Sequence, residues 1–318
     1  MAKRLYRNSH LGFEWGGLCA SFASLWIGLL AVVGPAGGIA LEDDLGFVVK
    51  LDTLPERIVS LAPSNTELLF ALGLGEKLVG VTEFCNYPEA AAAIEKVAGY
   101  SSLNTEKILA VKPDLVVAAR GNDLEGLGTL RHMGLPVFAL DIQSVEQMGG
   151  AVDRLGRLTG VEPRAQVLKE AWEVRLAQVK AVVDSLAARP GVMWGYWGET
   201  VYTAGEGSMI DDVIHLAGGV NVGRAAPGIW PLVSLETVVS WAPEVIITTY
   251  LPGSSDPNAL ELEIKRLREV DGWKSLPAVR NGRIYYLESD WLMRPGPRLL
   301  DALEYLAVLL HPEAFKKP

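Results

Sequence analysis

Two glutamates, Glu106 and Glu236, occupy the same place in a block of about seventeen residues that occurs twice, 130 positions apart. Each copy, Leu103–Ala119 and Val233–Thr249, has a helix-capping residue, the glutamate two residues later, a proline and then a β-branched run. A helix dipole favours a carboxylate in the first turn, and an exposed carboxylate there can pair with a cation on a partner surface. We expect ion pairing of this kind. The alternative is that each glutamate only stabilises its own helix.

A second set of side chains is aromatic and lies where strands are predicted to end. Aromatic residues in turn contexts fit a large, flat, partly apolar ligand, whereas the alternative is ordinary core packing. Asp290, Arg294 and Arg298 bracket the last aromatic and can bind amide, carboxylate or phosphate groups. The alternative to ligand binding is a structural role: Asp290 could cap a turn, and Arg298 could begin the final helix. The aromatic set is Tyr87, Tyr100, Tyr196, Trp197, Tyr202, Trp230 and Trp291.

Catalytic and metal-binding signatures are absent from the sequence. No nucleophile elbow, H-E-x-x-H motif or phosphate-binding P-loop occurs. The four histidines are scattered, and Cys85, the one cysteine beyond the first forty residues, is expected to be a small buried hydrophobe. We therefore expect no catalytic residue, no metal site and no cofactor.

The residues that must position these side chains alternate between strand and helix patterns. Ser64-Asn-Thr-Glu67 has the spacing of a capping box and predicts a helix that runs to Leu74. The alternation predicts an α/β lobe with a mainly parallel sheet over residues 41–144. Its predicted strands are Ile58–Leu61, Leu78–Val81, Leu115–Val117 and Val137–Leu140, and its further helices are Thr105–Val111 and Leu124–Met133.

A long helical pattern interrupts this alternation. Residues 145–189 contain no strand pattern, and a helix is predicted from Glu162 to Ala188. The alternation then resumes, so residues 190–318 are expected to form a second α/β lobe, with strands Val192–Tyr196, Val201–Thr203 and Val245–Thr249 and helices Met209–Leu216 and Leu235–Trp241. We predict two α/β lobes bridged by a long rigid helix, with a ligand cleft between the lobes, since ligands bind beyond the carboxyl ends of parallel strands.

The duplication extends beyond the glutamate block. Ser64-Asn-Thr-Glu67 aligns with Ser208-Met-Ile-Asp211 at an offset of 144 residues. Each lobe therefore has the same order of parts, which favours an internal repeat over generic similarity of strand–helix units.

The first forty residues have the layout of a leader. Lys3, Arg4 and Arg7 precede a stretch without charge from Trp15 to Leu41, and small residues precede a cleavage point after Ala40. We expect residues 1–40 to be a signal peptide. The alternative is an uncleaved N-terminal anchor, because the stretch exceeds the roughly 20 residues that a membrane span needs. Either way the remainder is expected to be periplasmic or extracytoplasmic.

The net charge also limits the partners. The chain carries a formal charge of −9 and has no basic stripe, which argues against a nucleic-acid partner.

Several motifs together identify a family. Arg57-Ile-Val-Ser-Leu-Ala-Pro63-Ser-Asn-Thr-Glu67, Asn86-Tyr87-Pro88, Lys112-Pro-Asp-Leu-Val116, Gly218-Gly219-x-Asn221 and Ser289-Asp290-Trp291 resemble the substrate-binding proteins of vitamin B12 and ferric-siderophore ABC importers. The likeness covers nearly all of residues 50–312. It implies the class III fold of periplasmic binding proteins and no enzymatic activity.

The resemblance is strongest to the members that bind vitamin B12, at Trp230-Pro231 and at Ser289-Asp290-Trp291. It implies that the ligand is a corrinoid, cobalamin in the first place. Tyr100 stands where those members have a tryptophan, and Ala119 replaces another, so the stacking surface of the first lobe is reduced. The residues expected at the ligand are Tyr87, Tyr100, Tyr202, Trp230, Asp290, Trp291, Arg294 and Arg298.

The resemblance also implies that Glu106 and Glu236 dock against arginines on the two halves of a dimeric ABC permease in the inner membrane. Matching carboxylates suit a twofold partner and favour fast, salt-sensitive docking. We expect the protein itself to be a monomer. The rival ligands are a ferric siderophore or haem. The rival from another class is an enzyme that inserts metal into tetrapyrroles, and neither His132 nor His215 follows a strand as its mechanism would need.

Overall fold

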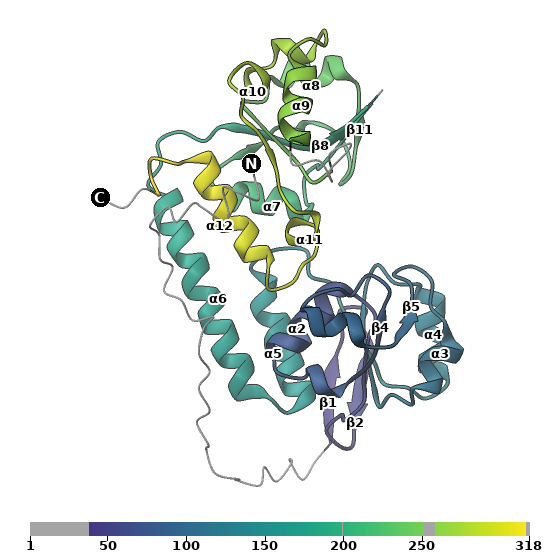
Figure 1. The fold of residues 1–318 in the computed structure, drawn as a ribbon. Coiled ribbons are helices and arrows are strands. Elements are labelled where there is room, and N and C mark those ends of the chain that lie inside the picture. Colours follow the sequence, from purple (N-terminus) through teal and green to yellow (C-terminus); the bar gives the residue numbers. More distant parts are fainter. Residues whose placement is uncertain (1–37, 199, 251–257, 316–318) are drawn as a thin grey trace. The chain divides into compact units, whose positions relative to one another are not determined.

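The chain has 318 residues, of which the computed structural model describes residues 38–198, 200–250 and 258–315. They divide into two units (Figure 1). The N-terminal unit contains the described residues up to Ala177 together with Met293–Asp301, and the C-terminal unit contains Gln178–Leu292 and the described residues from Ala302 onward. Residues 293–301 therefore belong with the N-terminal unit, whereas the sequence pattern assigns them to the second lobe.

The N-terminal unit is built on a five-stranded parallel sheet with the strand order β5-β4-β3-β6-β7. A separate antiparallel hairpin, β1–β2, precedes it. The four predicted strands are confirmed, but β1, β2 and β5 lack a clear sequence signal. The elements are β1 Ile39–Glu42, β2 Val48–Leu51, β3 Ile58–Ser60, α2 Pro63–Ala71, β4 Leu78–Thr82, β5 Lys96–Ala98, α3 Thr105–Ala110, β6 Leu115–Ala119, α4 Leu124–His132, β7 Val137–Leu140 and α5 Gln147–Thr159.

The C-terminal unit has a six-stranded sheet in the order β11-β9-β8-β12-β13, with β10 also paired to β8. Strands β10, β8, β12 and β13 run parallel, whereas β8–β9 and β9–β11 are antiparallel. Its elements are β8 Gly191–Trp197, β9 Val201–Thr203, α7 Met209–Leu216, β10 Val220–Asn221, β11 Leu232–Val233, α8 Leu235–Trp241, β12 Val245–Thr248, α9 Ala259–Leu267, α10 Pro277–Arg280, β13 Ile284–Tyr286, α11 Ser289–Leu292 and α12 Leu299–Leu310, which begins within residues 293–301.

Each unit encloses its own hydrophobic core. In the N-terminal unit, Val59, Val116 and Val137 from neighbouring strands pack against helix residues such as Ile108 and Leu127. In the C-terminal unit, a corresponding cluster joins side chains of β8 and β12 to Trp273 and to residues of the later helices. Uninterrupted apolar strands of this kind are expected where both faces of a parallel sheet are covered.

Helix α6, Glu162–Val183, carries the chain from the N-terminal unit into the C-terminal unit. Its 22 residues correspond to roughly 33 Å at 1.5 Å per residue. The helix ends at Val183, five residues before the predicted end at Ala188. The amides of Ser185 and Leu186 donate to the carbonyl oxygens of Val182 and Val183, three residues earlier, so the chain forms turns there instead of a further helical turn. The long helix between two α/β units is thus confirmed, although shorter than predicted.

The predicted leader falls almost entirely outside the described residues. Of residues 1–40, only Gly38, Ile39 and Ala40 are described, and Ile39 and Ala40 already pair with Leu51 and Lys50 in the β1–β2 hairpin. Cleavage after Ala40 would therefore divide β1. Within the described part of the chain, no helix combines the length and the apolar character that crossing a membrane requires.

The start of α2 differs from the predicted capping box. The helix begins at Pro63, and its N-cap residue, Ala62, has no side-chain hydrogen bond to the first turn. A proline at the first helical position has the right φ angle and lacks the N–H group that a cap would satisfy. Ser64 and Glu67 are both buried, and the Glu67 carboxylate is engaged by arginines instead of reaching back to the helix start.

Candidate functional site

The two glutamate blocks fold into matching helix–strand units. Asn104 caps α3 by accepting a hydrogen bond from the Lys107 amide at 2.9 Å, and Ser234 caps α8 by accepting one from the Thr237 amide at 3.3 Å. Glu106 and Glu236 lie in the first turns of these helices and both are exposed. The Ser234 hydroxyl and the backbone lower the pKa of Glu236 and so favour its charged form.

The repeat also extends to an unusual backbone conformation. Lys112 and Ala242, again 130 residues apart, have positive φ angles of 46° and 47°, and each directly precedes the proline of its block. A following proline disfavours the right-handed helical region, so the helix cannot simply continue. A left-handed conformation is costly for any residue other than glycine, and its presence in both copies shows that the two units end these helices in the same way.

The acid after each proline joins the end of the block to the central strand of its sheet. Asp114 accepts hydrogen bonds from the amides of Glu56 and Arg57, at 2.8 and 2.9 Å, just before β3. Glu244 accepts one from the amide of Gly191, at 3.0 Å, where β8 begins. These bonds fix the position of each glutamate-bearing helix relative to its sheet.

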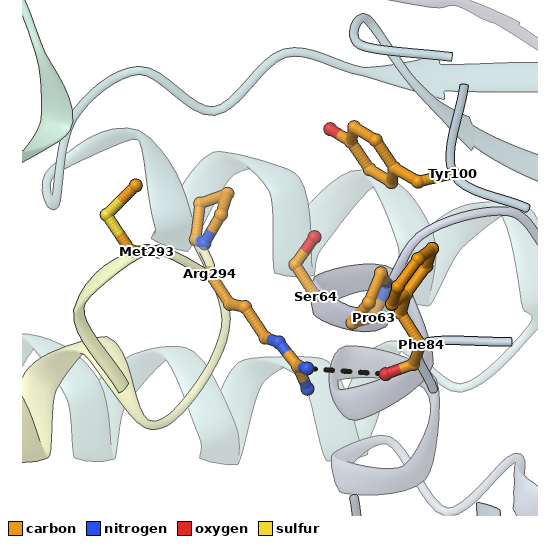
Figure 2. A pocket seen from close by; sticks show the side chains of 7 residues that line it. Pro63, Ser64, Phe84, Tyr100, Met293 and Arg294 are labelled. Atoms are coloured by element: carbon orange, nitrogen blue, oxygen red, sulfur yellow. Dashed lines mark hydrogen bonds between the residues drawn. The ribbon is translucent and has the colours of Figure 1, made fainter. Parts of the chain in front are cut away.

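The N-terminal unit contains a cavity of about 300 Å³ beside the start of α2 (Figure 2). It combines apolar surface with one guanidinium group, because Arg294 lies at its edge. The Arg294 guanidinium donates to the Asn86 side chain at 2.7 Å and to the carbonyl oxygen of Phe84 at 3.3 Å. The residues that line the cavity are Pro63, Ser64, Phe84, Tyr100, Met293, Arg294 and Pro295.

A buried ion pair holds residues 293–301 to the rest of the N-terminal unit. Arg298 donates two hydrogen bonds to Glu67, at 2.6 and 2.9 Å, and Arg294 lies 3.6 Å from the same carboxylate. The side chains of Glu67 and Arg298 are 2% and 14% exposed. The Arg298 guanidinium also lies 4.1 Å from the centre of the Tyr87 ring, which is itself exposed. The structure thus brings together the predicted site residues Tyr87, Arg294 and Arg298, with Glu67 as a partner that the sequence pattern does not indicate.

Tyr100 borders the same cavity and is held from two sides. Its carbonyl oxygen accepts a hydrogen bond from Asn122 at 2.7 Å, and its ring lies so close to Gly121 that a β-carbon there would come within 2.4 Å of the phenol oxygen. Burial, with a smaller contribution from the charge of Asp141, raises the pKa of Tyr100 and keeps its phenol neutral. The guanidinium of Arg120 pairs with the same Asp141 carboxylate at 2.7 Å.

The C-terminal unit contains an aromatic cluster at β8 and β9. The Tyr202 ring stacks on Trp230, with centroids 6.0 Å apart and planes 13° from parallel, and on Tyr196, at 6.1 Å and 16°. Trp194 packs edge-on against Trp230 from inside the unit, and Tyr250 packs edge-on against Tyr196. Trp230 is 39% exposed, so the stack offers an open aromatic surface.

Glycines allow the loop that carries Trp230 to approach β9. The Gly205 amide donates to the Ile229 carbonyl at 2.8 Å, and a β-carbon on Gly205 would lie only 2.0 Å from the Gly228 carbonyl oxygen. Gly228 has a φ angle of 95°, which other residues rarely adopt. The backbone therefore fixes the position of Trp230, and only glycine fits at Gly205.

Three further predicted positions, Trp197, Asp290 and Trp291, lie within a strand or a helix. Asp290 and Trp291 lie in the short helix α11 and are half-buried. Trp197 does not lie in a loop: it ends β8, packs against Trp273 at 5.4 Å and donates a hydrogen bond to Glu263 at 2.6 Å. The prediction that Trp197 lies in a loop is wrong, because the strand continues through it and its indole is hydrogen-bonded to Glu263 of helix α9.

The buried acid of the N-terminal unit has a counterpart in the C-terminal unit. Asp211, 144 residues after Glu67, accepts two hydrogen bonds from Arg224 at 2.7 and 3.0 Å and one from Asn221 at 3.0 Å. Burial alone would raise the pKa of Asp211, but these hydrogen bonds outweigh it and lower the pKa. Both units therefore have a buried carboxylate bound by an arginine at the start of the equivalent helix.

The described residues contain no group of three or more histidine, cysteine, aspartate or glutamate side chains that could hold a metal ion. What they contain is two partly apolar surfaces lined with aromatic rings and two exposed, equivalent carboxylates. Such surfaces can bind a ligand and a partner.

Comparisons with known proteins agree with this chemistry. The model of the periplasmic binding protein family matches residues 58–291. An uncharacterized ABC transporter substrate-binding lipoprotein of Bacillus subtilis, YvrC, is 30% identical over 286 residues, which are 88% of this chain and 87% of that protein.

Two solved structures show the same fold and bind different ligands. The periplasmic vitamin B12 binding protein of Vibrio cholerae is 32% identical, covers 83% of this chain and 99% of its own, and has a TM-score of 0.71. The periplasmic heme-binding protein of Roseiflexus sp. RS-1, in its apo form, is 27% identical, covers 81% of this chain and 99% of its own, and also has a TM-score of 0.71. The predicted fold is thus confirmed.

Proposed function

This chain belongs to the periplasmic binding protein family, and we propose that the solute it captures is a corrinoid, cobalamin or a close relative. The general function follows from the family: the chain is a solute-binding protein of an ABC importer, not an enzyme. Its relatives are periplasmic proteins or lipoproteins, which fits a site of action outside the cytoplasm.

The observation that carries the corrinoid proposal is the open stack of Tyr202 and Trp230. A corrin ring is broad and flat, with apolar faces and a rim of amides, and stacked aromatic rings bind such faces well. Tyr87, held over Arg298, and Tyr100 provide a second aromatic surface on the N-terminal unit. The motifs around Trp230 and Trp291 and the vitamin B12-binding relative support this ligand class.

Haem is the second candidate, and the heme-binding relative favours it because that protein shares the fold at 27% identity. A ferric siderophore fits less well. Its catecholate forms carry several negative charges, whereas the trio of Glu67, Arg294 and Arg298 has a net charge of only about one positive unit.

We also propose that Glu106 and Glu236 dock the protein onto a dimeric permease, one glutamate against each half. Both are exposed, both stand in the first turn of a capped helix, and both helices end in the same backbone conformation. A monomer with two such carboxylates presents one charge to each half of a twofold partner.

The ligand proposal is tested by titrating the exported protein with cyanocobalamin, dicyanocobinamide and haemin, using calorimetry and quenching of tryptophan fluorescence. We expect saturable one-to-one binding of at least one corrinoid, with quenching because Trp230 lies at the stacking surface. Binding of haemin without binding of either corrinoid would exclude the corrinoid proposal in favour of haem.

A further inference from the structure

Ser64 lines the cavity of the N-terminal unit and has an unused hydroxyl. The residue is only 6% exposed, yet its side chain has no hydrogen-bond partner among the described residues. Figure 2 shows the side chain between Arg294 and Tyr100, with its hydroxyl pointing away from α2. Because Ser64 lines the cavity and its hydroxyl makes no hydrogen bond within the described residues, the hydroxyl is open to the cavity and can bond to an occupant.

Other buried serines of this protein are satisfied internally. Ser60 donates to the carbonyl oxygen of Ala62 at 3.2 Å. Ser208, which occupies the position equivalent to Ser64 in the C-terminal unit, donates to the Gly205 carbonyl at 2.9 Å and caps α7 by accepting from the Asp211 amide at 3.1 Å. Ser64 does not have this capping role, because its helix begins at Pro63 and Ser64 lies within the first turn.

Two further kinds of donor lie beside this hydroxyl. Helix α2 has nine residues and no side-chain cap, and the amides of Ser64 and Asn65 in its first turn have no hydrogen-bond partner among the described residues. The Arg294 guanidinium is held at the edge of the same cavity by Asn86 and Phe84. A helix start and a guanidinium both favour a partner with negative charge on oxygen.

We propose that Ser64, with the start of α2 and Arg294, forms a subsite for an acceptor oxygen on the rim of the ligand. This inference rests on the proposed ligand-binding function and names the chemical group that the N-terminal unit recognises. The amide carbonyls and phosphate of a corrinoid and the carboxylates of haem all carry such oxygens. Phe84 and Met293 line the rest of the cavity and contact the apolar part of the ligand beside that oxygen.

The test measures the dissociation constants of wild type, Ser64→Ala and Ser64→Thr for cyanocobalamin, dicyanocobinamide and haemin. Losing one hydrogen bond to the ligand should weaken binding by about three- to tenfold in Ser64→Ala. Ser64→Thr keeps a hydroxyl and should lose less. Ser185→Ala is the control, because the Ser185 hydroxyl is bonded to the Val182 carbonyl in an exposed turn. Thermal unfolding of each variant verifies that it is folded.

The three ligands distinguish the source of the oxygen. An equal loss with cyanocobalamin and dicyanocobinamide identifies an amide carbonyl of the corrin rim, a loss with cyanocobalamin alone identifies the phosphate, and a loss with haemin identifies a carboxylate. Unchanged affinity of a folded Ser64→Ala for every ligand that the wild type binds overturns the subsite and leaves the proposed function intact. A wild type that binds none of the three overturns the proposed function itself.

Discussion

Replacing Glu67 with glutamine removes the carboxylate that two arginines share, and we expect it to lower the free energy of unfolding by about 3–5 kcal/mol at pH 7. The magnitude follows from burial. The side chains of Glu67 and Arg298 are 2% and 14% exposed, and their two hydrogen bonds measure 2.6 and 2.9 Å. A neutral amide would remove the negative charge that faces both Arg294 and Arg298 at a largely buried position.

The assay is urea denaturation followed by circular dichroism, arranged as a double-mutant cycle. Glu67→Met and Arg298→Met should each be strongly destabilising, whereas the double variant should cost less than either, since apolar side chains can replace a buried ion pair at little cost. Glu236→Gln, at an exposed first-turn glutamate, is the matched control and should shift the unfolding curve far less than Glu67→Gln does. A loss below about 1 kcal/mol in Glu67→Gln, or a double variant as costly as the two single changes added together, would refute the reasoning.

Three further predictions concern other parts of the molecule. Gly205→Ala places a β-carbon 2.0 Å from a loop carbonyl, so we expect a loss of about 1–3 kcal/mol in stability and a displaced Trp230, seen as weaker ligand binding and altered tryptophan emission. Combined Glu106→Lys and Glu236→Lys should abolish uptake while ligand affinity in solution stays unchanged; uptake at the wild-type rate would exclude docking through these glutamates. The hydrogen bonds from Arg266 lower the pKa of Glu263, so the stability that its charge provides is present above about pH 4.3 and is lost as the pH falls through the lowered pKa; in Glu263→Gln the unfolding free energy should depend less on pH in that acidic range.

The sequence predicts the parts of the fold that depend on neighbouring residues. Helices α7 and α8 have the predicted bounds because Ser208 and Ser234 cap them and apolar spacing marks their buried faces. The strand after each glutamate block is equally local, since a proline and a β-branched run follow directly. Of the candidate sites, the placement of Glu106 and Glu236 in exposed first turns follows from the same signals.

The contacts that complete the site are not local and leave little trace in the sequence. Glu67 and Arg298 are 231 residues apart, and the Ser64-Asn-Thr-Glu67 spacing by itself does not distinguish a carboxylate that caps its own helix from one that binds a distant arginine. The same ion pair places residues 293–301 in the N-terminal unit, against the division expected from the order of elements. The proline at position 63 is the one local signal that could have excluded the capping box.

Lys112 and Ala242 share one left-handed backbone conformation, so the two connections that follow α3 and α8 take the same path. Each half of a permease with two identical halves could then bind either of the two glutamate-bearing surfaces in the same way. If docking occurs as proposed, the protein has two degenerate orientations on its partner, and either one delivers the cargo. This degeneracy would raise the fraction of productive collisions about twofold without strengthening any single contact.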